Sequence, residues 1–226
     1  MLTIILAESS LELIPIQIHN HPSVRSYSKK YKKNPSEILL DNSWHFAAMK
    51  GLENEIKRGR PDIVHLTLLS LCTTPAFYEN KIKVFVHTLK DEVISLNNKT
   101  RLPKSYHRFQ GLMEKLLLTK TIKFDEEILM EMKNSSLSEL ISEIQPTQII
   151  GLTTKGKKIS LENLFDKIND LGGSTGNDQD VVVVKAGATL NAINIIGFTA
   201  TNSTQNNSTG ASNAVLNAKD GENVTI

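Results

Sequence analysis

A basic loop that runs into a proline and a carboxylate is the stretch of this sequence best suited to bind an anion. Arg60 precedes Pro61 and Asp62, and an apolar run over residues 66–71 follows. Proline has a fixed φ and no amide hydrogen, so Pro61 predicts the first turn of a helix. The Asp62 carboxylate then lies at a helix N-terminus, where negative charge is favoured, and can hold the Arg60 guanidinium. This arrangement can present an arginine to a phosphate or a base edge. The residues of the loop alone, however, favour the simpler interpretation, which is a solvated basic loop followed by a capped helix start.

A second basic segment, from Asn97 to Phe109, mixes cations with aromatic residues. Its cationic or titratable side chains are those of Lys99, Arg101, Lys104, His107 and Arg108. Such a loop can bind RNA, because cations contact phosphates and aromatic rings stack on bases. A solvent-exposed loop before an apolar helix over residues 111–118 explains the same residues equally well.

Composition sets broad limits on the protein. The chain has 226 residues, 39% of them hydrophobic, and a net charge of +2, so total charge alone does not indicate nucleic-acid binding. The single cysteine, Cys72, lies in an apolar run and is expected in the core of a protein from a reducing compartment. No apolar run approaches the roughly 18 residues that cross a membrane, and the first seven residues are too short for a signal peptide. We therefore expect a soluble, cytoplasmic protein. No metal site is expected, because His19 and His21 have no second ligand pair nearby.

The elements that must position the two basic segments follow from periodicity. Strands are predicted over residues 2–6, 38–40, 81–87, 92–96 and 181–184, and another strand begins at residue 149. Helices are predicted over residues 9–14, 23–33, 43–52, 61–71, 111–118 and 160–171. Residues 120–145 are predicted to be a helical region. The strands at 81–87 and 92–96 predict a hairpin. The four valines of residues 181–184 favour the core of a parallel sheet. Together these elements predict an α/β fold with the sheet flanked by helices.

The composition changes near the C-terminus. Residues 191–226 are rich in Asn, Thr, Ser, Ala and Gly, and give no helical face. Such a stretch buries little apolar surface, so disorder or irregular strands are expected. We predict a domain over residues 1–190 and a polar tail over 191–226.

Five spaced motifs resemble the Nep/Emg family. They read LAESSLELIP (residues 6–15), LLDNSWHFAAM (39–49), KRGRPDIVH (57–65), LKDEVISLNNKTRLPKSYHRF (89–109) and GLMEKLL (111–117). The match is specific as far as about residue 118 and continues more weakly to about residue 184. Beyond it, the closing loop and final helix of the family are not recognisable, so the tail departs from the family pattern.

The resemblance implies a SPOUT-class methyltransferase with a C-terminal trefoil knot, acting as a homodimer. The implied reaction is transfer of a methyl group from S-adenosyl-L-methionine to N1 of a pseudouridine in a small-subunit rRNA hairpin, with a role in rRNA processing and ribosome biogenesis. Contacts with ribosomal proteins also follow from that role. The alternative is a non-catalytic rRNA-binding assembly factor that has lost its cofactor pocket.

The resemblance also assigns site residues. RNA contacts carry over to Arg60, Arg101, Lys104 and Arg108; at Lys104 the family usually has arginine, so a phosphate contact is implied there without a bidentate fork. Asp62 carries over as the residue that orients Arg60. A role for Asp62 as general base is the weaker alternative, since pairing with an arginine lowers the pKa of a carboxyl. The implied cofactor contacts are Leu152 and Thr153, with Gly187 or Gly197 in a later turn.

Overall fold

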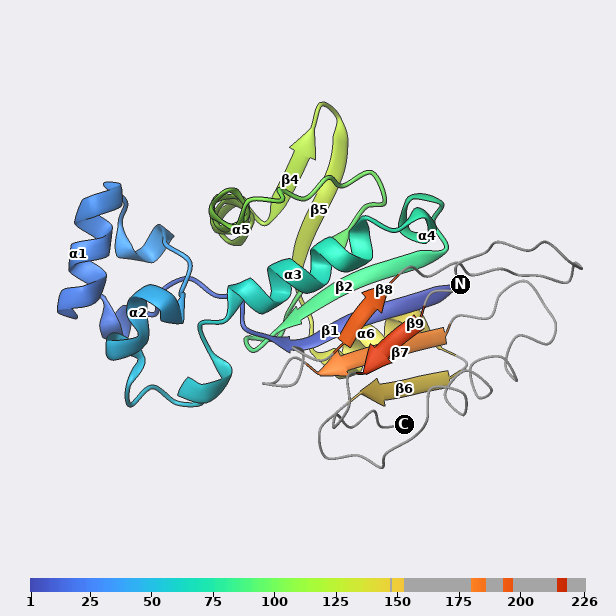
Figure 1. Cartoon of the computed structure of the whole chain (residues 1–226), viewed down its shortest axis with the longest axis horizontal. Helices are drawn as coiled ribbons and strands as arrows, with labels where there is room; N and C mark the ends of the chain where they lie inside the picture. The colour runs from blue at the N-terminus through green and yellow to red at the C-terminus, as the bar shows by residue number, and fades with distance from the viewer. Residues whose placement is uncertain (147, 153–179, 186–192, 197–214, 219–226) are drawn as a thin grey trace, which may run out of the picture.

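A seven-stranded mixed sheet is the centre of the described part of the chain (Figure 1). The computed structural model describes residues 1–146, 148–152, 180–185, 193–196 and 215–218. The strands are β1 (Leu2–Ser9), β2 (Ile82–Thr88), β3 (Glu92–Leu96), β4 (Thr121–Phe124), β5 (Glu127–Asn134), β6 (Gln148–Leu152) and β7 (Asp180–Lys185). Their spatial order is β4-β5-β3-β2-β1-β7-β6.

The sheet has a parallel half and an antiparallel half. β2, β1, β7 and β6 run parallel, with Ile4 of β1 between Val84 and Val182. β3, β5 and β4 continue from β2 as antiparallel neighbours. The predicted hairpin and the predicted parallel position of the four-valine strand are therefore confirmed. The parallel half requires apolar cover on both faces, which explains its nearly continuous runs of Val, Ile and Leu.

Helices cover the two faces of the sheet and form a lobe at one end. They are α1 (Pro22–Tyr31), α2 (Asn42–Met49), α3 (Pro61–Cys72), α4 (Pro75–Tyr78), α5 (Tyr106–Thr119) and α6 (Leu137–Ile144), with 3-10 turns η1 (Ile16–Ile18), η2 (Pro35–Glu37) and η3 (Glu55–Lys57). α3 and α5 pack on the face that contains Ile4 and Leu6. α6 covers the opposite face, where Leu140 meets Ile5 and Ala7. α1 and α2 stand apart from the sheet, around a core of their own that includes Val24 and Met49 (Figure 1).

The helix predicted over residues 9–14 is wrong. Its backbone is extended and pairs with the segment around Leu39: the Ile14 amide donates to Ile38 O and the Leu40 amide to Glu12 O, both at 2.9 Å. The strand predicted over 38–40 is reduced to a single bridge between Leu13 and Leu39. These mutual hydrogen bonds satisfy the backbone, which removes the need for a helix.

The helical region predicted over 120–145 is correct only at its end. Its first part is the β4–β5 hairpin, in which buried Met130 and Met132 alternate with exposed Glu131 and Lys133. That period of two is a strand pattern. α6 then begins at a capping box, where the Glu139 amide donates to Ser136 Oγ at 3.2 Å and the Glu139 carboxylate accepts from the Ser136 amide at 2.7 Å.

Two short strands are described in the predicted tail. β8 (Ile193–Ile196) and β9 (Val215–Ala218) pair antiparallel. The helix predicted over 160–171 lies outside the described residues, and the boundary at residue 190 stays a prediction. Within the described ranges, no helix has the length and apolar character needed to cross a membrane.

Candidate functional site

The predicted contact between Arg60 and Asp62 is present as a two-pronged ion pair. Arg60 Nε donates to Asp62 Oδ1 and the terminal guanidinium nitrogen donates to Oδ2, each at 2.9 Å. Arg60 is the N-cap of α3, Pro61 its first residue and Asp62 its second. Both charged side chains are about one-third exposed (35% and 41%), so the guanidinium is fixed in direction and still open to a ligand.

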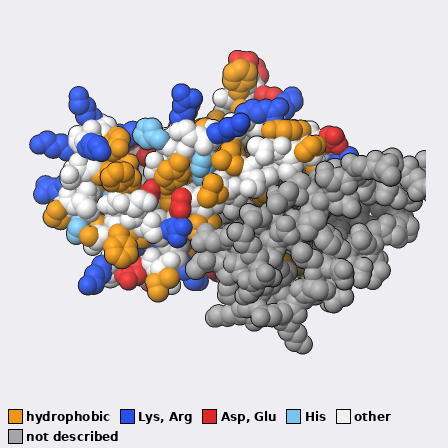
Figure 2. Space-filling model, in the orientation of Figure 1, with side chains coloured by type: hydrophobic (Ala, Val, Ile, Leu, Met, Phe, Trp, Pro, Cys, Tyr) orange, Lys and Arg blue, Asp and Glu red, His pale blue; other side chains and the backbone are white. Residues whose placement is uncertain are grey.

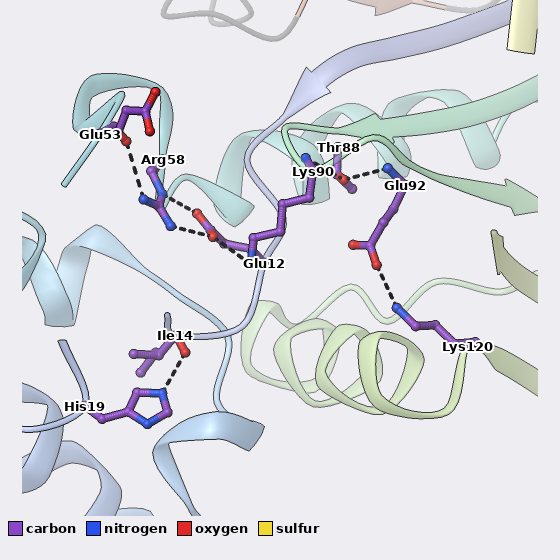
Figure 3. A network of polar contacts seen from close by, with 9 residues as sticks. All are labelled: Glu12, Ile14, His19, Glu53, Arg58, Thr88, Lys90, Glu92 and Lys120. Atoms are coloured by element: carbon purple, nitrogen blue, oxygen red, sulfur yellow. Dashed lines mark hydrogen bonds and ion pairs between the residues drawn. The ribbon is translucent and has the colours of Figure 1, made fainter. Parts of the chain in front are cut away.

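The other cations of the loop are paired with acidic side chains. Two guanidinium nitrogens of Arg58 donate to the buried carboxylate of Glu12, at 2.6 and 2.7 Å. Lys57 pairs with Glu8 at 3.2 Å. Figure 3 shows Lys90 reaching the same Glu12 carboxylate from the β2–β3 turn, with a separation of 3.3 Å. The Arg60 amide donates to Ser10 Oγ at 2.8 Å. The segment after β1 therefore holds the loop, and Arg60 is the loop arginine left to contact a ligand.

Gly59 allows the loop to turn tightly. Its φ is +67°, a backbone conformation that L side chains rarely adopt. Its carbonyl accepts from the Asn42 amide at 2.8 Å. A Cβ atom here would lie 2.8 Å from the end of the Met49 side chain and 3.1 Å from the Asn42 backbone nitrogen. Glycine is thus favoured by the positive φ and by the approach of the Asn42 backbone, whereas the flexible end of Met49 can shift.

Gly59→Ala is expected to destabilise the protein by about 2 kcal/mol, because backbone strain and a close contact add. For a chain of this size the melting temperature should fall by about 4–8 °C in differential scanning calorimetry. Gly51→Ala is the matched control: Gly51 also has a positive φ, +86°, but open space around its Cβ position. Equal losses in the two variants would show that the packing against α2 contributes nothing.

α3 connects the two basic segments. His65, on α3, is buried and its Nε2 lies 2.8 Å from the carbonyl oxygen of Pro103. The same ring stacks on Phe109, with centroids 4.4 Å apart. The helix that begins at Arg60 therefore also fixes the segment that contains Lys104 and Arg108. Two stretches some forty residues apart in the sequence are thus joined through one helix.

The second basic segment is only partly a loop. We expected a loop as far as Phe109, but α5 begins at Tyr106, so this prediction is wrong for the last four residues. Tyr106 and Phe109 are three residues apart and both pack on His65, which favours the helical turn. His107 and Arg108 lie exposed on that first turn.

The remaining predicted RNA contacts, Arg101 and Lys104, lie in the segment that leads into α5. The Arg101 guanidinium carbon lies 4.0 Å from the centroid of the Tyr78 ring, a cation–π contact at the C-terminal end of α4. Lys104 is exposed in the loop before α5. Figure 2 shows Lys and Arg side chains gathered over α1 and along the segment that leads into α5. We call Arg60, Arg101, Lys104 and Arg108 the cationic face; its contact with RNA stays a prediction.

Asp41 is the residue that the sequence reasoning missed. Its buried carboxylate caps α2 by accepting from the Ser43 amide at 2.8 Å, and also accepts from the Tyr106 hydroxyl and from Gln110 Nε2 at 3.0 Å. Burial, and then the hydrogen bond to Asp41, raise the pKa of the Tyr106 phenol far above its usual range. The signal in the sequence was an Asp two residues before Ser43, a typical N-cap pattern. Asp41 joins the α1–α2 lobe to the start of α5.

His45, on α2, has a structural role. The ring is fully buried and its Nδ1 accepts from the Asp41 amide at 3.1 Å. Burial lowers the pKa of His45, so the ring is neutral near pH 7.

The predicted cofactor contacts are described only at Leu152. This residue is buried at the end of β6, opposite Val184 of β7, with β1 the next strand along. Ligands of open α/β sheets bind beyond the carboxyl ends of such parallel strands. Thr153, Gly187 and Gly197 lie outside the described residues.

Comparisons with known proteins agree with this arrangement. A family model described as EMG1/NEP1 methyltransferase matches residues 4–220, a range that includes most of the predicted tail. The chain is 42% identical over 170 residues to ribosomal RNA small subunit methyltransferase Nep1 of Thermococcus sibiricus, covering 75% of this chain and 77% of the relative. It is 44% identical over 164 residues to the Saccharolobus solfataricus protein of the same name, covering 72% of each. The structure of Archaeoglobus fulgidus Nep1 bound to S-adenosylhomocysteine superposes with a TM-score of 0.68 at 38% identity, covering 80% of this chain and 77% of that one.

Proposed function

The chain belongs to the EMG1/NEP1 methyltransferase family, and from this premise we propose that it transfers a methyl group from S-adenosylmethionine to N1 of a pseudouridine in small-subunit rRNA. Its relatives are named as small-subunit rRNA methyltransferases, and the solved Nep1 structure holds the demethylated cofactor. The chain is an S-adenosylmethionine-dependent rRNA methyltransferase of ribosome biogenesis. The choice of N1 and of pseudouridine is the proposal.

The ion pair of Arg60 and Asp62, beside the first turn of α5, is the observation that supports RNA binding. This ion pair fixes one guanidinium at the N-terminus of α3, and His65 fixes the Lys104 to Arg108 segment beside the same helix. A guanidinium held in one direction beside a fixed backbone segment suits the phosphates of a folded RNA loop, since little ordering of Arg60 is required when the RNA binds.

The chemistry requires proton loss and alignment. In pseudouridine N1 carries a hydrogen. Methylation breaks this N–H bond and the S–CH₃ bond of S-adenosylmethionine, forms an N–CH₃ bond and releases S-adenosylhomocysteine, with the proton passing to solvent or to a base. S-adenosylmethionine supplies the methyl group as an electrophilic sulfonium methyl. Holding the nucleotide in near-attack geometry can contribute roughly 7–11 kcal/mol at best. The cationic face would contribute by fixing the phosphates on either side of a base that is turned out of its stack.

Asp62 acts by orienting Arg60. Burial raises the pKa of Asp62, but the hydrogen bonds and positive charge of Arg60 outweigh this effect and hold the pKa below its usual value. The hydrogen bond from Arg60 to Asp62 likewise raises the pKa of the guanidinium. A carboxylate with a lowered pKa is a weak proton acceptor near pH 7, so we assign Asp62 to positioning and not to proton removal.

The carboxyl ends of β6 and β7 fit the cofactor. Leu152 ends β6 next to Val184, at the sheet edge where α/β proteins bind ligands. We assign cofactor contacts to Leu152, Thr153, Gly187 and Gly197. The same proposal includes the trefoil knot, a homodimer, contacts with ribosomal proteins during assembly, and a cytoplasmic location.

The test uses two hairpins that differ in one nucleotide. The full-length protein is incubated with labelled S-adenosylmethionine and a small-subunit rRNA hairpin that has pseudouridine in its loop, or uridine at that position. Label should enter only the first hairpin, because N1 of uridine is bonded to ribose. Calorimetry should also show binding of S-adenosylhomocysteine. Hairpin binding without cofactor binding or transfer would instead support a non-catalytic assembly factor.

Arg101→Ala is expected to reduce the salt dependence of hairpin binding. Loss of one phosphate contact should lower the slope of log K against log salt by about 1. Lys99→Ala is the matched control, because Lys99 has the same charge in the same segment but is paired with Glu127 at 2.9 Å. The assay is fluorescence anisotropy over a range of salt concentrations. If the two variants change the slope equally, Arg101 makes no specific contact.

A further inference from the structure

Four rings from three helices form a row on the α1–α2 side of the molecule. From Trp44 on α2, the row passes to Tyr27 and Tyr31 on α1 and ends at His107 on α5, with successive centroids 5.4, 4.5 and 6.1 Å apart. We call these residues the aromatic row. None of the assignments above uses it.

The row is partly exposed and lies among lysines: Trp44 and His107 are exposed, and the two tyrosines are half-buried. Trp44 is 48% exposed although it is the largest side chain of its helix. Lys30 Nζ lies 5.2 Å from the ring centroids of both Tyr31 and Trp44. Lys29 and Lys30 form no ion pair with any described acidic residue, and Figure 2 shows the Lys and Arg side chains over this lobe. Exposed rings with unpaired lysines between them match the composition of single-strand binding surfaces.

Trp44 and Tyr31 lie outside the apolar core between α1 and α2, whereas Tyr27 packs against that core. The lobe already has an apolar core that includes Val24, Ile38, Ala48 and Met49. Glu114, an acidic residue that lines the same hollow as Tyr31, is paired with Lys33 and accepts a hydrogen bond from the Leu39 amide. The surface charge of the row is therefore positive, which favours an anionic partner with flat rings over an apolar protein segment.

The row is continuous with the cationic face. His107 ends the row and directly precedes Arg108 on the first turn of α5. Next to it lies a hollow of about 60 Å³, lined by Tyr27, Tyr31, Lys33, His107, Gln110, Gly111 and Glu114. An RNA chain held at Arg108 can therefore pass onto the row along this hollow, whose one acidic lining residue, Glu114, is paired with Lys33.

We propose that the aromatic row binds an unpaired RNA segment that flanks the target hairpin. Its bases stack on Trp44 and Tyr31, and Lys29 and Lys30 contact the phosphates between them. The proposal rests on the rRNA function above and adds a second RNA site, which contributes affinity by linking two contacts on one strand.

Trp44 is the single tryptophan of the chain, so its fluorescence reports the contact directly. Three RNAs are compared: the hairpin alone, the hairpin with about six unpaired flanking nucleotides, and the hairpin with the same flank base-paired to a complementary strand. Only the unpaired flank should quench Trp44 fluorescence, and it should tighten binding roughly fivefold or more. An unpaired flank that neither quenches nor tightens binding would overturn the proposal.

Substitutions at Trp44, Lys30 and Phe46 show whether the row contacts RNA directly or only stabilises the fold. Trp44→Ala and Lys30→Ala should each remove most of the gain from the flank and leave binding of the bare hairpin unchanged, whereas Trp44→Phe should retain part of it. Phe46→Ala is the control, since Phe46 is 76% exposed on the same helix but outside the row. Equal loss in Phe46→Ala and Trp44→Ala, or loss of bare-hairpin binding in Lys30→Ala, would contradict the assignment. If the bare hairpin is bound but not methylated, the proposed function is wrong. The fluorescence and affinity measured with the unpaired flank would still show whether the aromatic row binds RNA.

Discussion

Asp62→Ala is expected to lower kcat/KM for methyl transfer to the hairpin by about tenfold. The substitution removes both hydrogen bonds that fix the Arg60 guanidinium, each 2.9 Å long. Charge-assisted hydrogen bonds contribute about 1.5–3 kcal/mol, and the lower end applies because both side chains are about one-third exposed to water. Stability should change by less than about 1 kcal/mol, which corresponds to one favourable charge at a helix N-terminus.

A double-mutant cycle isolates the positioning role. If Asp62 acts only through Arg60, then Arg60→Ala and the double variant should have the same kcat/KM, and Asp62→Ala should add nothing to Arg60→Ala. The measurement is initial rate against hairpin concentration for the four proteins. Additive losses would show that Asp62 has a separate role, such as proton removal, and the orienting assignment would be wrong.

The pH profile gives an independent check. The lowered pKa of Asp62 means that the carboxylate is ionised above its ordinary titration range and is neutralised only as the pH falls below that range. Its stabilising pairing with Arg60 is present at higher pH and is lost when the pH falls through the folded-state pKa. A rate inflection between pH 6 and 8 therefore cannot come from Asp62, and should persist in Asp62→Asn if the wild-type protein shows one.

The Arg60 loop was predictable because its signals are local. A proline at the first helical position and an acid one residue later restrict the backbone without reference to the rest of the chain, and α3 begins at Pro61 as expected. The valine strand was predictable for a similar reason, since only a doubly covered strand is apolar on both faces.

The incorrect and missed predictions concern segments whose conformation depends on residues that are distant in the sequence. Residues 11–14 have a helical spacing of apolar side chains, but their backbone pairs with the segment at Leu39, more than twenty residues away. The start of α5 depends on His65, which packs on Phe109 from another helix. Likewise, no local pattern shows that Asp41 reaches Tyr106, sixty-five residues further along the chain. Such contacts exist only after the elements are assembled.

Asp41→Ala is expected to be the most destabilising of the substitutions considered, at about 3 kcal/mol. The Asp41 side chain is 1% exposed and its carboxylate accepts from three donors, so alanine leaves the Tyr106 hydroxyl and the Gln110 amide without their acceptor. Each unsatisfied buried group costs about 1–3 kcal/mol, and loss of the α2 cap adds about 1 kcal/mol. The melting temperature should fall by about 6–12 °C in calorimetry.

The same substitution should weaken hairpin binding more than its effect on stability explains. Asp41 connects the cap of α2 to the first turn of α5, and the next residue, Asn42, donates to the Gly59 carbonyl of the Arg60 loop. Without Asp41, Arg60 and Arg108 lose a fixed relative position, so binding measured well below the melting temperature should still weaken.

Asp41→Asn retains an acceptor for the Ser43 amide and should show a smaller loss. Asp91→Asn is the control, because Asp91 is an exposed acid whose carboxylate pairs with His87 at 3.1 Å; this substitution should change stability by less than about 0.5 kcal/mol. If Asp41→Ala binds the hairpin with unchanged affinity, the buried carboxylate stabilises the lobe but does not position the cationic face.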